Sequence, residues 1–166
     1  MRTGVALGSN LGNRLANLRA ARKAIIGLPR VRPPILPSAA YETEPIGLEA
    51  GAEKFLNAVL EFEYNGEPNE LLEQLFAIEE SLGRKRAHAR NVSRTIDIDL
   101  LYCGNHKINN ERLQLPHPRM HLRKFVLQPL SDIRPELVLP AQERSVRELL
   151  AHLREPAKVV RLKENW

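Results

Sequence analysis

The stretch Arg94-Thr95-Ile96-Asp97-Ile98-Asp99-Leu100-Leu101-Tyr102 decides how the rest of the chain is interpreted. In a β-strand, successive side chains point to opposite faces at a rise of about 3.3 Å per residue. Four apolar side chains would then share the core face: Ile96, Ile98, Leu100 and Tyr102. Asp97 and Asp99 would lie together on the other face, roughly 6–7 Å apart. Aspartate is disfavoured in strands and like charges repel, so the pattern indicates a cation beside the carboxylates.

Two kinds of cation could satisfy this acidic pair. Mg²⁺ is usually held by one or two carboxylates together with substrate phosphates. The alternative is an edge strand whose acids pair with nearby arginines. No histidine or cysteine cluster follows the pair, which argues against zinc.

The composition places limits on the kind of protein. The 166 residues are 43% hydrophobic and 27% charged, which is typical of a globular protein. This length predicts one domain, residues 1–166, although two very small domains are an alternative. Apolar runs fall short of the ~20 residues that cross a bilayer, and the N-terminus does not resemble a signal peptide. A single cysteine, Cys103, fits a reducing compartment. We therefore expect a cytoplasmic protein, without membrane association and monomeric.

Positive charge is concentrated just before the acidic strand. Five of the eleven residues from Arg84 to Arg94 are basic and none is acidic: Arg84, Lys85, Arg86, Arg90 and Arg94 are the basic ones. Arginine matches phosphate geometry with a rigid fork of donors. An acidic pair beside arginines suits Mg²⁺–nucleotide chemistry. The chain has no Gly-x-x-x-x-Gly-Lys-Ser/Thr loop, so a nucleotide site here would not be of the P-loop kind.

The order of expected elements predicts a fold class. Strands are expected at residues 5–7, 35–43, 55–64 and 96–102, and helices at about 15–26 and 68–82. The predicted class is α+β, with a ferredoxin-like βαββαβ core, an antiparallel sheet, and an extra C-terminal hairpin and helices. Gly104-Asn105 predicts a hairpin turn, 120–130 a short helix, and Ser145 with Glu148 a capping box.

Two further features have both a structural and a functional interpretation. Alternation along 55–64 puts Phe55 and Asn57 on the face opposite the core, as an aromatic surface beside an amide. They could bind a ligand, or pack in a second layer and bond to backbone. Glu79 borders the apolar stripe of its helix, where pairing with an arginine is the simpler interpretation.

Several blocks together resemble one family. They are ALGSNLG (6–12), YETEPIG (41–47), FLNAV (55–59), EESLGR (79–84), RTIDIDLL (94–101) and LPHPRM (115–120). The chain resembles the 6-hydroxymethyl-7,8-dihydropterin pyrophosphokinases of folate biosynthesis from about residue 4 to 140. The resemblance implies an ATP-dependent enzyme that transfers diphosphate to the hydroxymethyl group of the pterin and releases AMP.

The resemblance also implies roles for individual residues. Asp97 and Asp99 would hold two Mg²⁺ ions, and Arg84 and Arg94 would act with them in catalysis. The ATP site would be lined by Glu79, Arg86, Arg90, Arg112, His117 and Arg123. The pterin pocket would be built from Thr43, Ile46, Phe55, Asn57 and Phe125. This chain departs from many relatives at Asn91, where a tryptophan closes over the pterin, and it lacks the Gly-Pro before Arg94 and the Asp-Gln-Pro before Phe55.

Two rival functions remain open from the sequence. A basic ferredoxin-like module could bind RNA, although Asp97 and Asp99 would repel its phosphates where RNA-binding sheets display aromatic residues. A two-metal nucleotidyltransferase could use the same acidic pair, and would release pyrophosphate in place of AMP.

Overall fold

The computed structural model describes residues 1–45, 53–84, 93–154 and 158–166. Within these ranges, six strands form one antiparallel sheet. They are β1 (Arg2–Ser9), β2 (Val31–Pro37), β3 (Tyr41–Thr43), β4 (Phe55–Tyr64), β5 (Asp97–Cys103) and β8 (Val159–Arg161). The strand order is β5-β1-β4-β3-β8, and β2 also pairs with β4. A separate two-stranded sheet joins β6 (Ile108–Asn109) to β7 (Gln114–Leu115).

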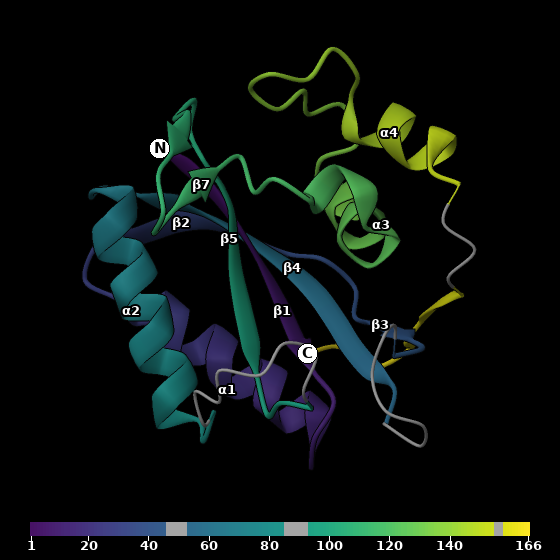
Figure 1. The fold of residues 1–166 in the computed structure, drawn as a ribbon. Coiled ribbons are helices and arrows are strands. Elements are labelled where there is room, and N and C mark those ends of the chain that lie inside the picture. Colours follow the sequence, from purple (N-terminus) through teal and green to yellow (C-terminus); the bar gives the residue numbers. More distant parts are fainter. Residues whose placement is uncertain (46–52, 85–92, 155–157) are drawn as a thin grey trace.

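Helices cover both faces of the large sheet (Figure 1). Helix α1 (Arg14–Ile26) and helix α2 (Pro68–Ser81) pack on one face. Helix α3 (Lys124–Ile133) and helix α4 (Val146–His152) pack on the other, after a 3₁₀ turn at Met120–Leu122. Among the described residues, none of the helices is long and apolar enough to span a membrane.

Local sequence explains where these helices begin. The Asn13 side chain accepts a hydrogen bond from the Ala16 N–H at 3.0 Å, which caps α1. Pro68 occupies the first turn of α2, where its missing N–H has no intrahelical partner to lose. Ser145 and Glu148 form the predicted capping box of α4.

The hydrophobic core on the α1/α2 face follows the predicted alternation. Every second residue of β4 is buried there: Leu56, Ala58, Leu60, Phe62 and Tyr64. Ile98 and Leu100 of β5 lie in the same core. The opposite face therefore carries the odd-numbered residues of β4 and, as far as Leu101, those of β5, including both aspartates.

Three local predictions are wrong. Tyr102 packs in the α3/α4 core, because the register of β1 and β5 shifts at Gly4 and Val5 and inserts an extra residue. The extended segment at 35–43 forms two strands, β2 and β3, with a break at 38–40. The hairpin expected after Gly104 does not return onto β5, since β6 pairs with β7.

Candidate active site

The two aspartates of β5 project from the face opposite α1 and α2, and each contacts an arginine. Arg84 Nη1 lies 2.5 Å from one oxygen of Asp97, and Arg94 Nη1 lies 2.5 Å from the other. Arg123 Nη1 lies 3.3 Å from Asp99 Oδ2. The arginine pairing that the sequence offered as an alternative is therefore present.

The environment of Asp97 favours additional positive charge. Burial raises the pKa of the Asp97 carboxyl above its ordinary value, and the neighbouring charge of Asp99 raises this pKa further. Arg94 and Arg84 act in the opposite direction. A bound cation would relieve the repulsion between the two carboxylates in the same way.

The two carboxylates fit a magnesium site better than a metal site built entirely from protein side chains. Within the described ranges, no group of three or more His, Cys, Asp or Glu side chains could hold a metal ion. Two carboxylates alone leave most of an octahedral shell open to water and phosphate oxygens, as Mg²⁺ sites commonly do. Asp97 and Asp99 fit this kind of site.

Glu79 fixes the position of Arg84 and the start of β5. Its side chain is 3% exposed, and it accepts a hydrogen bond from the Ile98 N–H at 2.6 Å. The same oxygen pairs with the Arg84 guanidinium. Burial raises the pKa of the Glu79 carboxyl to about 7, against the effect of Arg84. The arginine pairing expected for Glu79 is therefore present, and it belongs to the acidic site.

Asn10 is a positioning residue that sequence reasoning missed. It is fully buried after β1, and its Oδ1 accepts a hydrogen bond from the Arg94 N–H at 2.7 Å. Its Nδ2 donates to Ser93 Oγ at 3.0 Å, and its own N–H donates to the Arg94 carbonyl at 3.1 Å. The Gly-Ser-Asn sequence at 8–10, which is part of the ALGSNLG block, was the available signal.

The aromatic–amide pair of β4 lies on the same face as the aspartates. Gly8 of β1 stands opposite Asn57 on one side and opposite Asp97 on the other. Directly opposed residues point to the same face, so Asp97 and Asn57 are separated by two strand spacings, about 10 Å. A Cβ at Gly8 would lie 3.2 Å from Asn57 Oδ1 and 3.8 Å from Phe55 Cδ1. The missing side chain at Gly8 therefore lets the Asn57 amide and the Phe55 ring lie close to β1.

Thr43 and Phe125 complete the described part of this region. Asn57 Nδ2 donates to Thr43 Oγ1 at 2.8 Å, which fixes the orientation of the amide. Phe125 of α3 packs against the cluster that contains Val59, two residues along β4 from Asn57. The Arg123 guanidinium lies 5.5 Å from the Phe125 ring centroid, so Arg123 contacts both Phe125 and Asp99.

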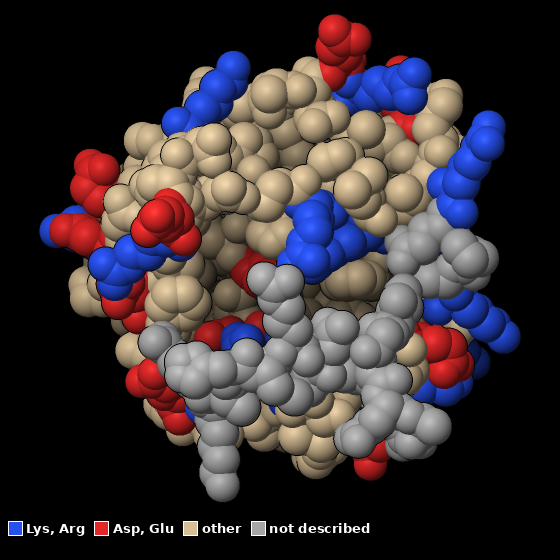
Figure 2. Space-filling view, in the orientation of Figure 1, with Lys and Arg blue, Asp and Glu red and all other residues tan. Residues whose placement is uncertain are grey.

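His117 is a second neighbour of Asp99, in addition to Arg123. Its Nε2 lies 4.0 Å from Asp99 Oδ2, and its N–H donates to the Leu101 carbonyl at 2.7 Å. Burial lowers the pKa of His117, in opposition to Asp99. Since Nδ1 accepts a hydrogen bond from the Arg119 N–H, the neutral ring carries its proton on Nε2, towards Asp99. Figure 2 shows acidic and basic side chains meeting near the centre of the face it presents.

Among the remaining predicted residues that the structure describes, Arg112 is not brought to this cluster. Arg112 is well exposed and pairs with Glu73 of α2. Ile46, Arg86, Arg90 and the unusual Asn91 lie outside the described residues.

Comparison with known proteins relates this geometry to a family. The sequence model of the 7,8-dihydro-6-hydroxymethylpterin-pyrophosphokinase family (HPPK) matches residues 4–135. A Haemophilus influenzae 2-amino-4-hydroxy-6-hydroxymethyldihydropteridine pyrophosphokinase is 42% identical over 136 residues, 82% of this chain and 83% of that protein. A protein of the same name from Methylorubrum extorquens is 39% identical over 158 residues, 95% of this chain and 96% of that protein.

A solved structure supports the fold. The Plasmodium falciparum HPPK-DHPS crystallised with pteroate superposes with a TM-score of 0.69 at 15% identity, over 90% of this chain. This chain spans 42% of that longer protein. The mixed α/β class with an antiparallel sheet is confirmed, and none of these relatives supports the RNA-binding alternative. The sequence motifs and the matched relatives agree, and the chain belongs to the 7,8-dihydro-6-hydroxymethylpterin-pyrophosphokinase family.

Proposed function

We propose that this protein transfers diphosphate from ATP to 6-hydroxymethyl-7,8-dihydropterin in folate biosynthesis and releases AMP. The observation that carries the proposal is the alignment of Asp97, Gly8 and Asn57 across three neighbouring strands. It puts an acid–arginine cluster and an aromatic–amide surface on one sheet face. Their separation of about 10 Å suits a triphosphate at one end and a flat heterocycle at the other.

The reaction places specific demands on the residues around the phosphates. The hydroxymethyl oxygen attacks the β-phosphorus, and the bond from this phosphorus to the α–β bridging oxygen breaks. AMP leaves with the bridging oxygen, and the hydroxyl proton is lost to solvent or a nearby acceptor. Arg84 and Arg94 would bind the transferred group and neutralise charge that develops on the leaving oxygen.

Asp97 and Asp99 would hold two Mg²⁺ ions together with phosphate oxygens. Bound magnesium supplies charge neutralisation and polarises the phosphoryl group. Arg84 and Arg94 contact Asp97, so they would exchange a carboxylate for phosphate oxygens when the nucleotide binds. Glu79 would keep Arg84 in place during this exchange.

The rest of the ATP site is proposed to include Arg86, Arg90, Arg112, His117 and Arg123. Arg112 would first leave Glu73, and an exposed ion pair of this kind is worth only about 0–1 kcal/mol. Arg123 would move from Asp99 towards the nucleotide while remaining close to the ring of Phe125.

The pterin pocket is proposed to contain Thr43, Ile46, Phe55, Asn57 and Phe125. Thr43 occupies one hydrogen-bond donor of the Asn57 amide, and the amide oxygen lies over Gly8. This oxygen is then available to accept from an N–H on the heterocycle edge. Phe55 and Phe125 would stack on the ring faces.

Product identification tests the activity directly. Purified protein would be incubated with Mg-ATP and the reduced pterin, and nucleotides would be separated by chromatography. AMP and the pterin diphosphate are expected, whereas ADP would refute the transfer of diphosphate. Asp97→Asn and Asp99→Asn should each abolish AMP release with the fold retained. Glu136→Gln, which cuts an exposed ion pair with Arg147, is the control and should be fully active.

Several broader features belong to the same proposal. The core is inferred to be ferredoxin-like, because it contains two strand-helix-strand units, β1-α1-β2 and β4-α2-β5. The first strands of the two units, β1 and β4, pair with each other antiparallel in the middle of the sheet. β6, β7, α3 and α4 would be its C-terminal additions. Residues 1–166 are proposed to form a single domain that works as a monomer. A cytoplasmic location agrees with Cys103 being a free, buried thiol.

A further inference from the structure

The segment 158–166 lies outside the stretch that the family model matches, and the proposed function gives it no role. It nevertheless forms strand β8 and ends on a buried tryptophan, Trp166. We propose that this C-terminal segment is a positioning element for the pterin pocket: Trp166 and β8 hold β3 in the register at which Thr43 orients the Asn57 amide. The inference deepens the proposed function and rests on it for the identity of the ligand.

Strand β3 is short and depends on both of its neighbours. It has three residues, and it pairs with β4 on one side and β8 on the other. Thr43 stands opposite Phe55 in β4 and opposite Val159 in β8. The Leu162 N–H extends this contact by donating to the Ala40 carbonyl at 2.8 Å. Without β8, β3 would be a three-residue edge strand, and edges of this length are only weakly held.

Trp166 fixes the chain just before β3. Its indole Nε1–H donates to the Ser38 carbonyl at 2.7 Å, and its side chain is 6% exposed within the α1/α2 core. Ser38 is bound to β4 in turn. Its N–H donates to the Val59 carbonyl and its Oγ accepts from the Val59 N–H, both at 2.9 Å. The indole therefore completes the hydrogen bonding of the segment that sets where β3 begins.

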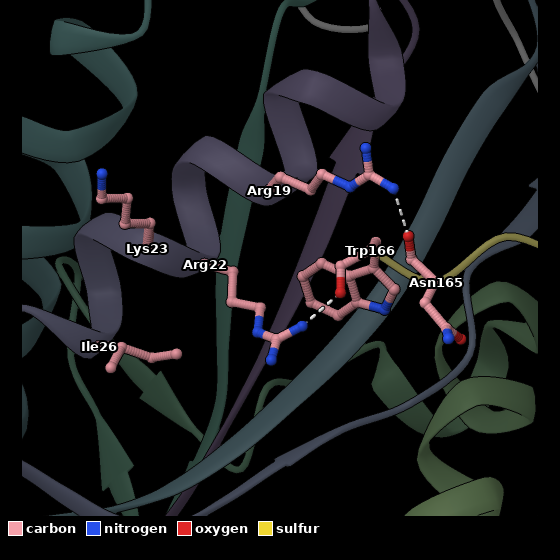
Figure 3. A pocket seen from close by; sticks show the side chains of 6 residues that line it. All are labelled: Arg19, Arg22, Lys23, Ile26, Asn165 and Trp166. Atoms are coloured by element: carbon pink, nitrogen blue, oxygen red, sulfur yellow. Dashed lines mark hydrogen bonds between the residues drawn. The ribbon is translucent and has the colours of Figure 1, made fainter.

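Helix α1 holds the other side of this tail. Figure 3 shows Arg19, Arg22, Lys23 and Ile26 on one face of the helix, beside Asn165 and Trp166, where they line a shallow pocket. Arg22 donates to the Trp166 main-chain oxygen, and its guanidinium lies 5.6 Å from the ring centroid. Arg19 Nη2 donates to the Asn165 carbonyl at 2.6 Å. The pocket therefore holds the chain's own C-terminal segment, and two of its cations, Arg19 and Arg22, bind that segment.

These contacts form a continuous path from the tail to the ligand surface. Trp166 holds Ser38, Ser38 and β8 hold β3, and Thr43 of β3 accepts from Asn57. No step of this path touches Asp97, Asp99 or their arginines. Loosening the tail should therefore weaken pterin binding and leave the phosphate end largely unaffected.

The test is the kinetic split of a Trp166→Phe variant, which keeps an aromatic ring and removes the N–H donor. The KM for the pterin should rise about tenfold, while kcat and the KM for ATP change less than about twofold. Lys23→Gln is the matched control, since it removes a cation of the same pocket that has no described bond to the tail. It should leave all three constants unchanged.

A second measurement, hydrogen exchange, does not depend on enzyme activity. Hydrogen exchange of the amides in 41–43 and 159–162 should quicken in Trp166→Phe and not in Lys23→Gln. Thr43→Val combined with Trp166→Phe should cost no more pterin affinity than Thr43→Val alone, because both act through one contact. Arg19→Gln, which cuts a bond of the tail at an exposed site, gives the same direction if Trp166→Phe folds poorly.

The outcomes separate the two proposals. If the wild type releases no AMP, the proposed function is wrong, whatever the tail does. If the wild type is active and Trp166→Phe keeps its pterin KM and its exchange rates, the tail inference is wrong. A fall in kcat with an unchanged pterin KM would also overturn it.

Discussion

Replacing Gly8 by alanine tests whether the space between the acidic cluster and Asn57 is used by the ligand. The backbone at Gly8 is that of an ordinary strand residue, paired on both sides, so alanine brings no conformational strain. Alanine in place of glycine favours folding by about 0.4–1 kcal/mol through the unfolded chain. The new Cβ would lie 3.2 Å from Asn57 Oδ1, which must yield by a few tenths of an ångström. Overpacking of this kind costs roughly 1–3 kcal/mol, so the variant should be less stable by about 0–2.6 kcal/mol.

The substitution should also weaken binding of the pterin. The added methyl group displaces the amide that reads the heterocycle and occupies the floor beneath the ligand. A loss of about 1.4 kcal/mol of binding free energy corresponds to a tenfold higher Kd for the pterin. Titration calorimetry with the pterin and an unreactive ATP analogue would measure this, and thermal unfolding would monitor the fold. Gly27→Ala at the end of α1, where the backbone is already helical, is the control. Unchanged pterin affinity in Gly8→Ala would refute the assignment of this surface.

Three other perturbations address the acidic end of the site. The Glu79 pKa rises from 4.5 to about 7 on folding, so the folded protein binds more protons between these values and loses stability as pH rises through them, by up to about 3 kcal/mol. Denaturant unfolding at about pH 5 and about pH 7.5 should show this decline in the wild type and a smaller decline in Glu79→Gln; the same fall in unfolding free energy in both proteins would contradict it. EDTA should stop turnover while shifting the Tm by less than about 1 °C, because a two-carboxylate site contributes little to folding; a large fall in Tm would indicate a structural metal instead. Asn10→Ala removes the side-chain acceptor of the part-buried Arg94 N–H and should cost about 1–3 kcal/mol of stability, with kcat falling more than the pterin KM rises; an unchanged kcat would argue against a role for Asn10 in placing Arg94.

Periodicity was sufficient for most of the fold, because β4 and β5 each bury one face completely. Alternation along 55–64 correctly separated the core residues from Phe55 and Asn57. It failed at Tyr102, since one extra residue in a strand reverses every later side chain and leaves no trace in composition. It also missed the break at 38–40, which is made by the Ser38 hydroxyl bonding β4.

The contacts of the site were harder to foresee than its members. Motif blocks identified Asp97, Asp99 and Asn57, but strand register alone shows that Gly8 stands between them. The roles of Asn10 and Trp166 were not predicted, because each side chain forms a hydrogen bond with backbone that is far away in the sequence. Asn10 bonds to Arg94, and Trp166 bonds to Ser38. Hydrogen bonds of this kind depend on tertiary placement, for which a single sequence carries no periodic signal.

Charge balance explains how one cluster could bind metal and nucleotide together. Among the described residues, three acids and three arginines are paired here: Glu79, Asp97 and Asp99 with Arg84, Arg94 and Arg123. ATP carries about four negative charges, which two Mg²⁺ ions would offset. Binding them together would therefore leave the cluster near neutrality, with the metal taking the carboxylates and the arginines taking the phosphates. Either component alone would leave several uncompensated charges in a partly buried site, where they are costly. The proposed function thus requires metal and nucleotide to bind as a unit, and Mg²⁺ without ATP should bind only weakly.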